Sequence, residues 1–129
     1  MNTAIIEKIE LDFTSIEIYE NYLISRIKEG LVFEEAHLRQ FYVIFEKYFA
    51  GKPFVSIADR KNDYTIDPNL LRDSRFSNLL GIGVICYSDA SFNTALFEKT
   101  FFKGAFEPFY SLDDCISWAL DLIHQYESE

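Results

Sequence analysis

The residues best suited to chemistry lie in one charged loop, ADRKNDYTIDP at 58–68, directly after an apolar stretch. Arg60 and Lys61 supply two cations. Asp67-Pro68 is typical of a helix start, because aspartate accepts backbone N–H bonds at the cap and proline fits the first helical position. A helix N-terminus also attracts anions. The loop is therefore a candidate site for an anion or a partner, formed by Asp59, Arg60, Lys61, Tyr64, Thr65 and Asp67.

The same loop has a simpler interpretation, which the sequence leaves open. Asp59, Asp63 and Asp67 are interspersed with the cations and would neutralise them in a solvated loop that binds nothing. The position of the loop favours a function, however. It follows a strand expected at the centre of a sheet, and open α/β sheets bind ligands at the carboxyl ends of such strands.

A second candidate site is aromatic. Aromatic residues make up 17% of the chain, which is more than a small core requires, and exposed aromatic area often marks a binding surface. Phenylalanines beside a closing helix also fill ordinary cores, so both interpretations stay open. The residues expected to roof a pocket for an apolar ligand are Phe97, Phe101, Phe102, Phe106, Phe109 and Tyr110.

Side chains that act as nucleophiles or bases are poorly placed for catalysis. His37 and His124 fall within predicted helices rather than at strand ends, and a nucleophile needs a nearby base. Cys86 lies in an apolar strand, where a thiol is inert. Asp113 and Asp114 are adjacent, so on a helix they point in different directions and are better explained as first-turn acids. We predict no catalytic residue, metal site or cofactor, and no enzyme motif is present.

Charge and length restrict the partners. A net charge of −9 repels phosphate backbones, so nucleic acid is not an expected partner. The N-terminal residues lack the pattern of an export signal, and the longest charge-free run, 76–88, is too short to cross a bilayer. We therefore expect one domain over 1–129, located in the cytoplasm, without stable membrane insertion. The expected partner is another protein or a second copy of this chain.

Apolar periodicity predicts the elements. Alternation through Ile9, Leu11 and Phe13, then Ile16 and Ile18, then 22–27 predicts three strands in an antiparallel meander, with turns at Thr14-Ser15 and Glu20-Asn21. Spacings of three and four predict a helix over 33–50, ended by Gly51 and Pro53.

Continuous apolar runs at 54–58 and 81–87 predict strands that are covered on both faces. A short helix is expected after Asp67, a third after Ser88 or Asp89, and a fourth from Ser111. The segment KGAFEPFY at 103–110 reads as an irregular edge or a short strand. The predicted fold class is α/β: a mixed sheet of about five strands, antiparallel first and parallel later, with about four helices.

This order, together with FVSIADR, GIGVICY and FEKTFFKGAFEPFYSLDDCISWA, resembles the SpoIIAA-like branch of the STAS fold. These small domains are related to anti-sigma-factor antagonists and to lipid-binding SEC14 proteins. The resemblance implies a non-catalytic regulatory or protein-interaction module. Its SEC14 kinship implies an alternative, a carrier or sensor of a small apolar ligand or lipid.

The sequence departs from the antagonists at one important place. In those proteins a kinase phosphorylates a serine at the helix N-terminus after a central strand. The equivalent stretch here, 59–69, contains no serine. Thr65 is the nearest hydroxyl, and Ser74 and Ser77 come after the first helical turn. A phosphorylation switch is therefore not predicted at this junction.

Overall fold

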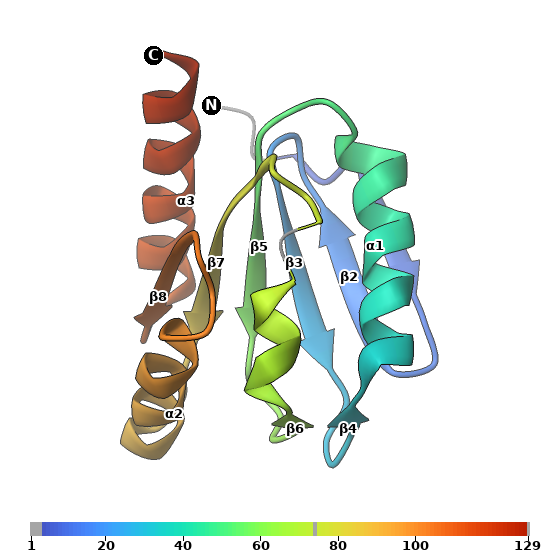
Figure 1. Ribbon diagram of the computed structural model, residues 1–129, viewed down its shortest axis with the longest axis vertical. Helices are drawn as coiled ribbons and strands as arrows, with labels where there is room; N and C mark the ends of the chain where they lie inside the picture. The colour runs from blue at the N-terminus through green and yellow to red at the C-terminus, as the bar shows by residue number, and fades with distance from the viewer. Residues whose placement is uncertain (1–3, 74, 129) are drawn as a thin grey trace.

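The computed structural model describes residues 4–73 and 75–128, and a six-stranded sheet forms its centre. The strands lie in the order β1-β2-β3-β5-β7-β8 (Figure 1). Their bounds are Glu7–Glu10 for β1, Thr14–Ile18 for β2, Tyr22–Ile27 for β3, Phe54–Asp59 for β5, Leu79–Ile85 for β7 and Ala105–Phe109 for β8.

The first three strands form the predicted antiparallel meander. The first turn lies earlier than predicted, because β1 ends at Glu10 and Thr14-Ser15 already belongs to β2. The backbone N–H of Leu11 donates to the carbonyl of Thr14 at 2.9 Å and closes this tight turn. Phe13 points into the core from the turn itself. Apolar alternation therefore continues through the turn and conceals it.

The other half of the sheet is parallel, since β3, β5, β7 and β8 all run in the same direction. As predicted, β5 and β7 are central strands, each paired on both sides. The segment at 103–110, predicted as an irregular edge or a short strand, contains the regular edge strand β8. Pro108 fits there because an edge strand tolerates a missing backbone N–H.

Helix α1, Glu35–Phe49, covers the β2-β3-β5 part of one face. The backbone N–H of Glu34 donates to His37 Nδ1 at 2.9 Å, so His37 helps to cap this helix. Gly51, with φ of 75°, follows its end. Aromatic side chains fill the space between helix and sheet, namely Phe13, Phe33, Phe41, Phe45, Phe49 and Phe54.

Helices α2 and α3 pack on opposite faces of the sheet. α2, Asp89–Lys99, is capped by Ser88 and packs through Ala95 against Val84 and Phe106. α3, Leu112–Glu127, is capped by Ser111 and covers the other face. Alternate residues of β3, β5 and β7 form its core, which includes Tyr22, Ile24, Val55, Ile57 and Ile85. α1 and α2 thus share one face, over its two halves (Figure 1).

Two glycines of β7 allow α3 to approach the sheet closely. A Cβ atom on Gly83 would lie 2.5 Å from Cys115 Sγ, and one on Gly81 would lie 2.9 Å from Leu122 Cδ1. Both distances are shorter than van der Waals contact. Any larger residue in these positions would push against side chains of α3.

The structure corrects the prediction between β5 and β7. The element after Asp67 is a single short 3-10 helix, η1, Pro68–Arg72, so the described chain has three α-helices rather than about four. Asp67 does cap it, accepting from the Asn69 N–H at 3.0 Å. Strands β4, Val32–Phe33, and β6, Thr65–Ile66, form a second small sheet. Two residues per strand are too few to produce a periodic signal.

Candidate functional site

An apolar cavity of about 390 Å³ lies on the face of the sheet shared by α1 and α2. Its floor is the centre of the sheet, where Ser25, Ser56 and Ala58 present small side chains. The volume is well above that of an engineered cavity of about 150 Å³ that binds benzene, and lies in the range of small-molecule sites. The apolar part of the wall includes Ile27, Phe33, Leu38, Phe41, Phe45, Ile66, Leu70, Leu71, Phe76, Leu79, Ile82, Val84, Phe102 and Phe106.

The cavity follows from the arrangement of the helices. α1 covers β2, β3 and β5, while α2 covers β7 and β8, so neither α-helix fills the middle of this face. Residues 60–73, which contain η1, and residues 75–77 cover the middle instead. Of these, Leu70 and Leu71 are only partly buried. Ser56 and Ala58 keep partial solvent access although they lie on a central strand.

One charged group, Arg60, lies in the largely buried inner wall of this cavity. The side chain of Arg60 is 13% exposed, its Nε donates to the Tyr64 hydroxyl at 3.1 Å, and its Nη2 lies 2.7 Å from Glu98 Oε1. Glu98, on α2, is 3% exposed. Its Oε1 accepts no hydrogen bond within the described chain, so the contact is an ion pair outside hydrogen-bond geometry.

This ion pair leaves the inner wall nearly neutral. Burial opposes the charge on Arg60, but Tyr64 and Glu98 raise its pKa above the ordinary value, so the guanidinium stays protonated. Its Nε–H donates to Tyr64, and its Nη2 forms the ion pair with Glu98. The rest of the guanidinium has no other polar partner among residues 4–73 and 75–128, and it can donate to an oxygen inside the cavity.

The exposed residues of the wall mark the mouth. These are Arg72, Asp73, Ser77, Lys103 and Gly104, from the end of η1, the segment after it and the α2–β8 connection. Arg72 lies over the ring of Phe101, 4.8 Å from its centroid, and its Nε donates to Asn69 Oδ1 at 3.0 Å. The two sides of the mouth therefore touch each other through Arg72.

The predicted loop site is divided between two faces of the sheet. Arg60 and Tyr64 lie in the cavity wall. Asp59 points to the opposite face, because side chains alternate along a strand. Lys61 is exposed and outside the cavity, Thr65 lies in β6, and Asp67 caps η1. Ser74 lies outside the described residues.

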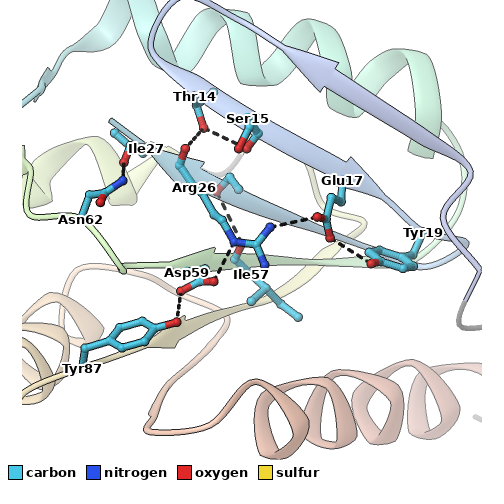
Figure 2. Close-up of polar contacts among 11 residues, drawn as sticks. Thr14, Ser15, Glu17, Tyr19, Arg26, Ile27, Ile57, Asp59, Asn62 and Tyr87 are labelled. Carbon is cyan, nitrogen blue, oxygen red and sulfur yellow. Dashed lines mark hydrogen bonds and ion pairs between the residues drawn. The ribbon is translucent and has the colours of Figure 1, made fainter. Parts of the chain in front are cut away.

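Asp59 belongs to a polar network on that opposite face, and Figure 2 shows Arg26 between Asp59 and Glu17. Arg26 Nε donates to Asp59 Oδ2 at 2.9 Å, and its Nη1 donates to Glu17 Oε2 at 3.0 Å. The hydroxyls of Tyr87 and Tyr19 donate to Asp59 and Glu17. Burial and the bond to Glu17 raise the pKa of Tyr19 to about 12. Each of these five side chains has a hydrogen-bond partner within the network, which is typical of a structural role.

The predicted aromatic set is also divided. Phe102 and Phe106 line the cavity, and Phe101 supports Arg72 at the mouth. Phe109 packs on Trp118 of α3, on the other face. The remaining two, Phe97 and Tyr110, are 60% and 56% exposed.

Sequence reasoning missed the floor of the cavity and the buried acid. Ser56 and Ala58 alternate with Val55 and Ile57 in FVSIAD, and this small-large alternation was the available signal. It indicates that one face of the strand lacks bulk. Nothing in the sequence marks Glu98 as buried, because acidic residues on helices usually face solvent.

The residues with catalytic chemistry are separate from the cavity. Cys86 and Cys115 are free, buried thiols, and burial raises the pKa of Cys115 to about 12. His37 is a helix cap. Within the described part of the chain, no group of histidine, cysteine and acidic residues could hold a metal ion. No helix in that part is both long and apolar enough to cross a membrane.

Comparison with known proteins supports the fold. No protein-family model and no curated protein sequence matches this chain. Among solved structures, the chain is similar to an uncharacterised protein from Shewanella loihica PV-4, of the DUF3478 family and with a SpoIIAA-like fold. The two share 18% identity over 82% of this chain and 91% of that one, with a TM-score of 0.61. This chain has a SpoIIAA-like fold, as its element order predicted.

Proposed function

We propose that this protein is a non-catalytic module that binds a small apolar molecule in the cavity over β3, β5 and β7. The observation that carries the proposal is the cavity itself: about 390 Å³, with a mostly apolar wall and one charged pair, Arg60–Glu98, at its inner end. Binding sites for small molecules combine an apolar lining with a few placed polar groups. The cavity opens to solvent at its mouth, so a ligand can enter it.

A filled-cavity variant tests the proposal. In Ala58→Phe, the ring should occupy the floor of the cavity, remove binding of an uncharged polarity-sensitive dye such as Nile red, and raise the melting temperature. Ala90→Phe makes the same substitution at an exposed position on α2 and should keep dye binding. The expected result is saturable binding by the wild type and the control only. Equal binding by all three proteins would contradict the proposal.

Native mass spectrometry of the tagged protein, recovered gently from its own host, supplies an independent test. A retained mass of lipid size in the wild type, absent from Ala58→Phe, supports the ligand module. A bare polypeptide that also fails to bind the dye would overturn it.

A regulatory protein-interaction module is the second candidate, favoured by one surface. Among residues 4–73 and 75–128, three of the nine exposed large apolar side chains lie on α2 or contact it: Leu96, Phe97 and Tyr110, whose hydroxyl donates to Asp89. Exposed apolar residues gathered on one element often mark a protein interface. Replacing Leu96 and Phe97 with Gln should remove a co-purifying polypeptide, whereas Val43→Gln on α1, at a site 69% exposed, should not. Unchanged recovery of the polypeptide from both variants would exclude this surface.

A further inference from the structure

The mouth of the cavity is cationic although the chain carries a net charge of −9. Arg72 and Lys103 are the two basic residues of the exposed wall, and Asp73 is its one acid. Asp73 is already engaged by the next basic residue along the loop. Its Oδ1 accepts from the Arg75 backbone N–H at 2.9 Å, and its Oδ2 lies 3.7 Å from Arg75 Nη2.

Neither cation of the mouth is neutralised by this arrangement. Lys103 makes no ion pair and no side-chain hydrogen bond within residues 4–73 and 75–128. Arg72 makes only its neutral contacts, to Asn69 and to the ring of Phe101. These two contacts hold the guanidinium in place, so little conformational entropy is lost when it meets an anion.

The interior and the mouth therefore differ in charge. Inside, Glu98 balances Arg60, and the rest of the wall is mostly apolar. At the mouth, two positive charges are unbalanced. Resting on the proposed function, we propose that the cavity takes a single-chain anionic amphiphile, with the apolar chain inside and a carboxylate or phosphate headgroup between Arg72 and Lys103.

Displacement of Nile red by three probes with the same chain tests this assignment. The probes are dodecanoate, dodecyl phosphate and dodecanol, each below the concentration at which it aggregates. All three should displace the dye, because all three fill the cavity. The anions should bind roughly fivefold to tenfold more tightly than the alcohol at low salt. Added NaCl should reduce this difference, because the mouth is exposed to solvent. Comparison of the two anions identifies the headgroup.

Charge-removal variants locate the headgroup. The double variant Arg72→Gln, Lys103→Gln should reduce the affinity for both anions to the affinity for dodecanol. Its affinity for dodecanol itself should not change. Lys8→Gln with Lys28→Gln changes the net charge equally at exposed positions outside the cavity wall, and should keep the preference for anions. Equal affinity of all three probes for the wild type would overturn the anionic assignment while the ligand module stands. Failure of every probe and of the dye would overturn both.

Discussion

At the scale of single residues, Arg60 and Asp59 show how much of the candidate site can be predicted from the sequence. The sequence identified both as candidate site residues, yet Asp59 ends β5 and Arg60 follows it, and the two side chains lie on opposite faces of the sheet. Arg60 joins Tyr64 and Glu98 at the cavity, and Asp59 joins Arg26 and Tyr87. A charged loop indicates where polar side chains lie close together in the chain. It does not indicate which face receives each side chain.

Removing the charge of Glu98 should destabilise the protein strongly. Glu98→Gln leaves the guanidinium of Arg60 in a largely buried place without a counter-charge. We expect a loss of about 3 kcal/mol in the free energy of unfolding, because removal of one charge of a buried pair leaves the other charge buried without a partner. Urea unfolding followed by circular dichroism measures this loss.

The matched control is Glu107→Gln. Glu107 also pairs with a cation, Lys99, at 2.7 Å, but both side chains are more than 40% exposed. Its loss should cost less than about 1 kcal/mol, as for other surface pairs. Similar costs at the two positions would show that the Arg60–Glu98 pair is effectively solvated.

At the scale of elements, periodicity predicted most helices and strands but not the contacts that set the distance between α3 and the sheet. Gly81 and Gly83 could be read as residues of a buried strand. Their contact with α3 depends on Cys115, Trp118 and Leu122, which lie more than 30 residues later in the chain. For the same reason the pairing of β4 with β6 was missed. Such features are set by tertiary packing and leave little local trace.

Gly83→Ala should therefore destabilise the packing of α3 on the sheet. The new methyl group would lie 2.5 Å from Cys115 Sγ, and overpacking of this kind typically costs about 1–3 kcal/mol. Denaturant unfolding of Gly83→Ala, Cys115→Ala and the double variant gives a double-mutant cycle. Because Cys115→Ala removes the clashing sulfur, the double variant should be more stable than the sum of the single losses. Strict additivity would mean that the sulfur of Cys115 is not the group that opposes the new methyl.

At the scale of the whole molecule, the mixed sheet and the SpoIIAA-like fold were predictable from the order of elements. The cavity was not. It exists because α1 and α2 cover separate halves of one face and a loop with one short 3-10 helix covers the middle. The sequence predicted a short helix there, and Asp67-Pro68 does start one, but this start signal does not distinguish a 3-10 helix from an α-helix. The abundance of aromatic residues did favour an apolar site, but most phenylalanines lie outside the wall of the cavity.

The whole molecule should lose stability in alkali. Burial raises the pKa of Cys115 from 9.0 to about 12, and burial with the bond to Glu17 raises that of Tyr19 from 10.0 to about 12. Both groups hold their protons more tightly in the folded chain. Their contribution to the free energy of unfolding is therefore complete below pH 9, and it is lost as the pH rises to 12. Unfolding in urea at several pH values measures the slope, which Cys115→Ala should reduce. A flat profile over this range would contradict the assignment.

The two borders of the sheet decide how copies of this protein can meet. One border is β1, where Glu7, Lys8 and Glu10 are exposed and charged, and the other is β8, which contains Pro108. Charged side chains and proline are the means by which proteins prevent a sheet from recruiting strands of a second molecule. Continuous growth of the sheet from chain to chain, the first step toward a fibre, is therefore disfavoured at both borders. A homodimer is therefore expected to form through side chains on the faces of the molecule rather than by pairing of strands.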